Sequence, residues 1–276
     1  MSLRKGSNGT AVRDLQLKLN AAGASIVVDG WFGDATQKAI EQFQDKHDLP
    51  RTGYAGVRTL ALLAGESRSK FIQNSQLAAA AVVLGVSFAA MASVAEVESN
   101  GFGFFACGRP SILFERHVFY RQLFEQDAAA AEECAAKYPN ICSQARGGYT
   151  GGSGEYQRFA IAYQLNPKAA ICACSWGMFQ IMGFHWRALG YPSPQAFKQA
   201  MDTSEGEQLN ALVKFIEADP VLHKALKARK WAEFAKRYNG PAYKENDYDI
   251  KLARAYQQFN TVFNANTQDT GNVDVA

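Results

Sequence analysis

The sequence predicts a mainly α-helical protein in two parts: a small three-helix unit, and a larger, mostly helical domain with a short β element. A glycine-turn motif that occurs twice before residue 65 marks the small unit. Beyond it, apolar residues recur at the spacing of amphipathic helices, and Ile112–Phe114 has the length and composition of a short strand. A chain of 276 residues is long enough for one small domain and one of ordinary size.

Composition narrows the classes of function. A hydrophobic content of 47% with 20% charged residues is typical of a globular protein. The net charge of +3 is too small to indicate a nucleic-acid partner, although it is compatible with an anionic cell-envelope target. Five cysteines do not describe a disulfide scaffold, and the four histidines do not cluster with them at metal-ligand spacing. We expect no metal and no organic cofactor, and the sequence leaves a Cys134–Cys142 bridge open.

The small unit contains a duplication. Gly30–Thr36 recurs as Gly53–Thr59, 23 residues later. Each copy predicts glycine turns around an aromatic residue, followed by a threonine that caps the N-terminus of a helix. The expected helices are 10–20, 36–46 and 59–63. Their inward side chains should be Val12, Leu15, Leu19, Ala39, Ile40 and Phe43.

This segment resembles the peptidoglycan-binding domain of bacterial and phage wall hydrolases. The matching residues are Leu3–Gly6, Val12, Leu15, Gln16, Leu19, Asp29, Gly30, Phe32, Gly33, Thr36, Ala39, Phe43–Gln44, Asp48–Leu49, Gly53 and Gly56. The resemblance implies a wall-binding module, residues 1–65, which a short polar linker (66–71) joins to the next domain. We expect Phe32 and Phe43 in its core. Trp31 and Tyr54, in the glycine turns, are the candidates for contact with sugar or peptide.

The stretch Leu77–Ala95 carries no formal charge, which raises the question of a membrane span. Gly85 interrupts it and Ser87 is a good helix N-cap, so we expect two short buried helices and no span. The N-terminal residues have no apolar run behind their charges, so we expect no conventional signal peptide.

Glu98 is the candidate catalytic acid. On a helix, Glu98 shares a face with Met91 and Val94, whereas Glu96 points away from that face. Gly101 should end the helix, which places Glu98 at the negative end of its dipole. Burial and the dipole would both raise the pKa of Glu98 and keep it protonated, as the proton donor of glycoside cleavage requires. The alternative is a solvated acid at a helix end.

Glu115, at the end of the predicted strand, is a candidate second carboxylate. It could act as a base for the attacking water or as a charge that stabilises an oxocarbenium ion. Alternatively, it is a structural acid paired with Arg116 or His117. The glycine-rich run 147–154 lacks the context of a phosphate-binding loop. We expect a loop over a cleft, with Tyr149 available to meet a sugar face.

The apolar run that begins at Ser175 is predicted as a helix, which Ser175 caps and whose first turn Gly177 opens to close approach. Gln180 interrupts its apolar face and needs hydrogen-bond partners, which an amide-rich sugar could provide. A later helix ends at Gly240 and carries Tyr238 and Asn239 in its last turn. Between them, a core stripe is predicted at Leu209, Leu212, Val213 and Ile216.

Three motifs together resemble the lysozyme-like superfamily of goose-type lysozymes and soluble lytic transglycosylases. They are Glu98–Ser99 after an apolar helix, Ser175–Met182, and Tyr238–Gly240. Within that superfamily, Ala95–Ser99, Ile112–His117 and Ser175–Gly183 resemble the N-acetylmuramidase domain of modular phage endolysins. The resemblance implies a lysozyme-like domain over 72–264, with Glu98 as general acid. It implies that Ser175, Gln180, Tyr238 and Asn239 line sugar subsites, whereas a role for Glu115 does not transfer.

The expected function is therefore that of an endolysin, which cleaves the β-1,4 bond between N-acetylmuramic acid and N-acetylglucosamine and lyses the host cell. Two alternatives stay open: a lytic transglycosylase that leaves 1,6-anhydro ends, and a non-catalytic wall-binding protein. We expect a monomer made in the host cytoplasm, which reaches the wall in the periplasm after a holin-type partner permeabilises the membrane. Residues 265–276 are expected to form a polar tail.

Overall fold

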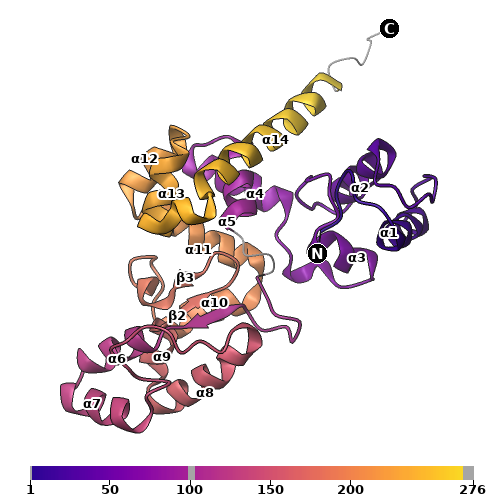
Figure 1. The fold of residues 1–276 in the computed structure, drawn as a ribbon. Helices are drawn as coiled ribbons and strands as arrows, with labels where there is room; N and C mark the ends of the chain where they lie inside the picture. Colours follow the sequence, from indigo (N-terminus) through magenta and orange to yellow (C-terminus); the bar gives the residue numbers. More distant parts are fainter. Residues whose placement is uncertain (1, 99–102, 270–276) are drawn as a thin grey trace. The chain divides into compact units, whose positions relative to one another are not determined.

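The computed structural model describes residues 2–98 and 103–269 (Figure 1). The chain forms two compact units. The first combines the chain up to Val97 with the chain from Val221 onward, and the second is Glu98–Pro220. Helices dominate, and one three-stranded sheet is present in the described part of the chain. The predicted fold class is therefore confirmed.

Three helices form the N-terminal part of the first unit: α1 (Thr10–Ala21), α2 (Asp34–Lys46) and α3 (Val57–Leu63). They enclose a core made of Val12, Leu15, Leu19, Phe32, Ala39, Ile40, Phe43 and Ala55. All six side chains predicted to point inward belong to this core. Phe32 and Phe43 are buried in it, as expected.

A buried glutamine organises each copy of the duplicated turn. In the first copy, Gln16 Nε2 donates to the carbonyl of Trp31 and to the hydroxyl of Thr36, both at 3.1 Å. Gln16 Oε1 accepts the N–H of Gly30 at 2.9 Å. The turn is therefore held from inside by one amide side chain, which satisfies backbone groups that the turn leaves unpaired.

Gln44 plays the same part in the second copy. Its Nε2 donates to the carbonyl of Tyr54 at 3.0 Å and to the hydroxyl of Thr59 at 3.1 Å, and its Oε1 accepts the N–H of Gly53 at 3.1 Å. The repeat in the sequence is therefore a repeat of one hydrogen-bonding arrangement.

The prediction that Thr36 and Thr59 cap their helices is wrong. Each helix begins two residues earlier, and Gly33 and Gly56 occupy the N-cap positions. Both threonines are buried in the first turn, where their hydroxyls accept from the glutamines. Each threonine hydroxyl therefore bonds a glutamine of another helix, whereas an N-cap hydroxyl would bond a backbone N–H of its own helix.

The uncharged stretch forms two short helices, as predicted: α4 (Asn74–Leu84) and α5 (Phe88–Glu98). Gly85 ends α4 in the left-handed conformation at φ 61°, and the hydroxyl of Ser87 accepts the N–H of Ala90 at 3.2 Å. The chain bends by 113° at this break. Among the described residues, no single helix has the length and apolar character that a membrane crossing needs.

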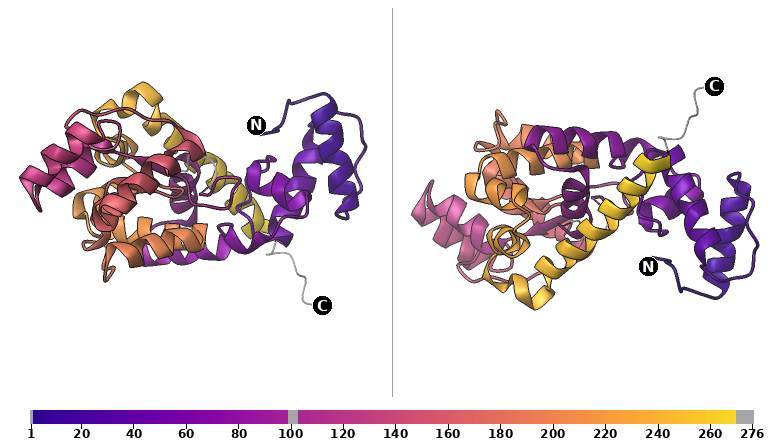
Figure 2. Two further views of the ribbon diagram at one scale, coloured as in Figure 1. Left: turned by 90° about the horizontal axis from the view of Figure 1, so that it is seen from below. Right: turned by 90° about the horizontal axis from the view of Figure 1, so that it is seen from above.

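The remaining elements of the first unit are a 3₁₀ turn η1 (Arg68–Lys70), α12 (Pro220–Lys227), α13 (Trp231–Asn239), η4 (Pro241–Asn246) and α14 (Tyr248–Asp269). Helices α13 and α14 pack against each other. Helix α14 leads to the C-terminus in both views of Figure 2 and continues to Asp269, into the segment expected to be a polar tail.

The second unit surrounds the small sheet. Its strands are β1 (Ile112–Phe114), β2 (Cys174–Trp176) and β3 (Ile181–Met182). Its helices are α6 (Arg116–Phe124), α7 (Ala128–Lys137), η2 (Gly152–Gly154), α8 (Glu155–Leu165), α9 (Pro167–Cys172), η3 (Gly183–Trp186), α10 (Pro194–Thr203) and α11 (Glu205–Glu217). The strands pair antiparallel in the order β1-β2-β3, with Ser175 opposite both Leu113 and Met182. The predicted strand and the predicted core stripe of α11 are confirmed.

The predicted helix at Ser175 is wrong, because this run forms the hairpin β2–β3. Gly177 and Gln180 adopt left-handed φ values of 70° and 50° in the intervening turn. Gly177 also lies against Gln208 of α11: an added Cβ would be 2.4 Å from Gln208 Cδ. The close approach expected at Gly177 is therefore made by another part of the chain. The helix prediction fails because all three β2 residues are buried, so the sequence lacks the apolar–polar alternation that identifies a half-exposed strand.

Candidate active site

Glu98 is the last residue of α5, and its side chain is buried. It is 8% exposed and follows the fully buried Met91 and Val94 on the same face. The inward orientation expected from the helix is therefore observed. The expected helix stop at Gly101 lies outside the described residues.

Glu96 has different surroundings. It is half-buried and accepts a hydrogen bond from the hydroxyl of Tyr54. Burial, followed by the nearby Glu96 charge, raises the pKa of Tyr54. The Tyr54 hydroxyl therefore keeps its proton at neutral pH and donates a hydrogen bond to Glu96.

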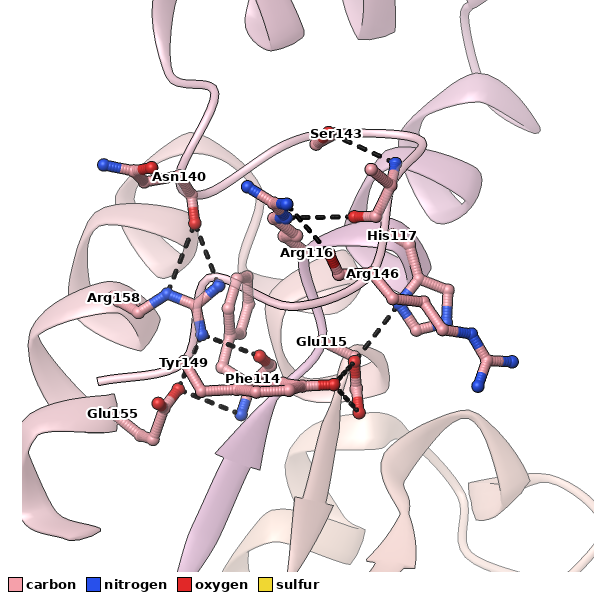
Figure 3. Close-up of polar contacts among 11 residues, drawn as sticks. Phe114, Glu115, Arg116, His117, Asn140, Ser143, Arg146, Tyr149, Glu155 and Arg158 are labelled. Carbon is pink, nitrogen blue, oxygen red and sulfur yellow. Dashed lines mark hydrogen bonds and ion pairs between the residues drawn. The ribbon is translucent and has the colours of Figure 1, made fainter. Parts of the chain in front are cut away.

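Glu115 lies between β1 and α6, where three segments converge (Figure 3). The Tyr149 hydroxyl donates to the Glu115 carboxylate and lies 3.0 and 2.9 Å from its two oxygens. His117 Nδ1 lies 3.1 Å from Glu115 Oε2, which is an electrostatic contact rather than a well-aligned hydrogen bond. The structure thus brings together Glu115 and Tyr149, which the sequence singled out separately, and also realises the pairing with His117 that was the alternative.

The protonation of this cluster follows from burial. Burial raises the pKa of the Tyr149 hydroxyl, and hydrogen bonding to Glu115 raises it further. Burial lowers the pKa of His117, and the Glu115 charge only partly offsets this. At neutral pH we therefore expect a protonated Tyr149 and a neutral His117.

Sequence reasoning missed the charged pair behind this cluster. Glu155, the first residue of α8, is fully buried and accepts from Arg158 Nη1 at 2.7 Å. The same carboxylate accepts two backbone N–H groups of the glycine-rich loop. It also accepts the N–H of Phe114 in β1 (Figure 3). The available signal was an acid that starts a helix directly after a glycine-rich loop, with an arginine three residues later.

Ser175 and Gln180 meet across the turn of the hairpin. The two polar side chains lie 2.6 Å apart, Ser175 Oγ donating to Gln180 Oε1, and Gln180 Nε2 donates to the carbonyl of Gly177 at 2.8 Å. The partners that Gln180 was expected to need are therefore supplied by its own hairpin.

Tyr238 and Asn239 are the last residues of α13 in the first unit, and both are half-buried. The Tyr238 ring stacks on Phe234, with centroids 5.7 Å apart and planes 8° from parallel. Gly240 and Pro241 follow the helix, as predicted.

The two candidate wall-contact residues differ. Trp31 is 53% exposed, and its ring lies over Gly33, where an added Cβ would be 3.2 Å from Cδ1. Tyr54 lies over Gly56 in the equivalent way, but it is half-buried and its hydroxyl is bonded to Glu96. Trp31 is thus the aromatic that the first turn presents to solvent.

Histidine, cysteine and acidic side chains are the groups that could hold a metal ion. In residues 2–98 and 103–269, no three such side chains form a group that could hold a metal ion. All five cysteines are free thiols, including Cys134 and Cys142.

Comparison with known families gives two matches. The N-acetylmuramidase family model matches residues 87–260, and the putative peptidoglycan binding domain matches residues 8–63. Among curated proteins, a zinc D-Ala-D-Ala carboxypeptidase of Streptomyces albus G is 41% identical over 61 residues, which are 21% of this chain and 24% of that protein. The chain thus matches about a quarter of that relative's length.

Among solved structures, the chain is similar to the crystal structure of the endolysin of Burkholderia phage AP3. The two share 48% sequence identity with a TM-score of 0.87, over 95% of this chain and 100% of the endolysin chain. The N-acetylmuramidase match covers more than half of the sequence. The chain therefore belongs to the N-acetylmuramidase family, and it carries a peptidoglycan-binding type of domain at its N-terminus.

Proposed function

We propose that this protein degrades peptidoglycan by hydrolysing the β-1,4 bond between N-acetylmuramic acid and N-acetylglucosamine, with Glu98 as general acid. The observation that carries the proposal is a buried carboxyl at the end of α5, inside the segment that matches N-acetylmuramidases. Burial disfavours the charged form of a carboxyl, so it favours a group that keeps its proton until the leaving oxygen takes it.

In the proposed reaction, Glu98 gives its proton to the glycosidic oxygen while C1 of the muramic acid gains oxocarbenium character. Water then attacks C1 and releases a proton. Glu115 is the proposed second carboxylate, as the base for that water or as the charge that stabilises C1. Its contact with Tyr149, a proposed sugar-binding residue, supports this assignment. Tyr149, Ser175, Gln180, Tyr238 and Asn239 are the proposed sugar-binding residues.

The proposed acid is tested by clearing of purified peptidoglycan with the wild type and with Glu98→Gln. A general acid contributes roughly 100-fold to 10,000-fold to the rate, so we expect the variant to lose activity by a factor in that range. Glu96→Gln is the matched control: it makes the same change two residues away and keeps an acceptor for Tyr54. If Glu98→Gln clears the wall as fast as the wild type, the assignment is wrong.

Mass spectrometry of the products tests the reaction type. Hydrolysis leaves a reducing end that is one water heavier than the 1,6-anhydro end of a lytic transglycosylase. Anhydro ends from the wild type would overturn hydrolysis but leave Glu98 as proton donor. A wild type that binds the wall and releases no fragments would instead support a non-catalytic wall-binding protein.

For the whole chain, we propose a wall-binding domain at 1–65, a linker at 66–71, a catalytic domain at 72–264 and a tail at 265–276. The match of the peptidoglycan-binding domain to residues 8–63 supports the first of these. We further propose a monomer that is made in the host cytoplasm and reaches the wall through a membrane permeabilised by a holin-type partner. Similarity to a phage endolysin over 95% of the chain supports this route to host lysis.

A further inference from the structure

We propose that Glu155, paired with Arg158, is a positioning residue for the active site: it holds the Tyr149 hydroxyl on the Glu115 carboxylate. The inference rests on the proposed function, in which Glu115 and Tyr149 belong to the site.

The carboxylate of Glu155 contacts the backbone beside both partners of that hydrogen bond. Figure 3 shows its contact with Phe114. Oε1 accepts the N–H groups of Thr150 at 2.6 Å and Gly151 at 2.8 Å, the two residues that follow Tyr149. Oε2 accepts the N–H of Phe114 at 3.3 Å, directly before Glu115. One side chain thus sets the separation of two segments that are far apart in sequence.

Arg158 completes the arrangement. Its Nη1 donates to Glu155 Oε2 at 2.7 Å and to the carbonyl of Phe114 at 2.9 Å, and its Nε and Nη2 donate to the carbonyl of Asn140. Both charged side chains are buried. A buried ion pair adds little stability compared with apolar residues of similar size. Its contribution here is to fix the positions of the backbone segments that it bonds.

The loop that carries Tyr149 needs such a support because its own sequence favours no single conformation. Its glycines with positive φ are Gly147 (87°), Gly148 (74°), Gly151 (78°) and Gly152 (53°). Arg116 holds the near end of the loop by donating to the carbonyls of Ala145 and Arg146 at 2.9 and 2.8 Å. Glu155 holds the far end, so Tyr149 is fixed from both sides.

A double-mutant cycle on kcat/KM with soluble peptidoglycan fragments tests the proposal. Tyr149→Phe removes a hydrogen bond to a charged group, and we expect a loss of about 10-fold to 100-fold. Glu155→Gln should cause a similar loss. If Glu155 acts through Tyr149, the double variant should lose no more than the larger single loss. Losses that multiply would overturn the proposal while the Glu98→Gln result, and with it the proposed function, still stands.

A second readout does not depend on activity. In the wild type, burial and Glu115 raise the pKa of Tyr149. Glu155→Gln should return this pKa toward the ordinary tyrosine value, because the hydroxyl leaves the carboxylate. NMR of protein with ¹³C-labelled tyrosine follows the titration, with Tyr149→Phe to assign the signal. An unchanged titration in a folded Glu155→Gln variant contradicts the proposal.

Two further variants separate positioning from stability. If Glu155→Gln does not fold, Glu155→Gln with Arg158→Gln leaves no uncompensated buried charge and serves in its place. Leu212→Ala, at a fully buried position of α11, should lower the melting temperature and removes none of the cluster's hydrogen-bonding groups. It should keep the Tyr149 titration of the wild type, and a shift of that titration in Leu212→Ala would show that general loosening explains the effect.

Discussion

At the scale of single residues, the proposed sugar-binding side chains already have partners inside the protein. Ser175 bonds Gln180, and Glu115 accepts from Tyr149. A sugar that binds to these groups has to replace or extend internal hydrogen bonds. Such exchanges change affinity little when the new bond is equally good, so these positions contribute specificity more than binding strength.

His185 is a residue whose burial makes stability depend on pH. Its ring lies 4.4 Å from the ring of Phe184 and 5.1 Å from that of Phe215, centroid to centroid. Burial lowers its pKa from the ordinary 6.5. The unfolded chain therefore binds a proton here at a higher pH than the folded chain does, and the free energy of unfolding should fall as pH drops through this range.

Urea unfolding at about pH 7.5 and 5.5 measures this effect. His47 and His117 also have lowered pKa values and contribute in the same direction. His185→Phe should therefore reduce the pH dependence without abolishing it. A variant with the same pH dependence as the wild type would show that His185 takes no part.

At the scale of elements, the hairpin β2–β3 forms because of its contacts with other parts of the fold and not because of its own sequence pattern. All residues of β2 are buried, so the run has neither the alternation of a half-exposed strand nor a polar face that excludes a helix. The short strand β1 and the stripe of α11 were predictable, because their patterns are local. The hairpin was not, because pairing with β1 selects it.

Gly177→Ala tests how tightly this hairpin packs on α11. The change places a Cβ 2.4 Å from Gln208 Cδ and requires a left-handed alanine at φ 70°. We expect a loss of about 2–4 kcal/mol in the free energy of unfolding. Gly190→Ala is the matched control: φ is 74°, but nothing lies within 4 Å of the added Cβ. It should lose only about 1 kcal/mol. Equal losses in thermal or urea unfolding would show that the Gln208 contact is unimportant.

At the scale of the whole molecule, distant parts of the chain share one compact unit. The N-terminal helices, α4, most of α5 and the chain from Val221 onward group together, and Gln258 of α14 donates to the carbonyl of Thr52 at 2.9 Å. The N-acetylmuramidase match, residues 87–260, therefore runs through both compact units. The division expected near residue 65 rests on the duplicated motif, its family resemblance and the short polar linker, and it stays a prediction.

Retention on the wall should depend on Trp31. Its ring is 53% exposed on the first glycine turn, and burial of an aromatic side chain on binding contributes about 1.5–3 kcal/mol. Trp31→Ala should therefore weaken sedimentation with insoluble peptidoglycan roughly tenfold or more. Cleavage of short soluble fragments should not change.

Val27→Ala is the control for that experiment. Val27 is 76% exposed in the same part of the chain and lies outside the glycine turns. It should sediment like the wild type. Equal retention of Trp31→Ala and Val27→Ala would remove Trp31 from the proposed wall contact.

Local pattern alone was sufficient for the helical class, the N-terminal core, the break at Gly85 and the inward face that carries Glu98. Each depends on side chains within a turn or two of one another, where helix and turn periodicity operate. Long-range contacts set the rest: the buried threonines that do not cap, the hairpin at Ser175, and the Glu155 carboxylate that bonds Phe114 across 41 residues. A hydrogen bond between distant segments depends on the tertiary fold that brings them together, and the local sequence of one segment does not specify which other segment it will contact.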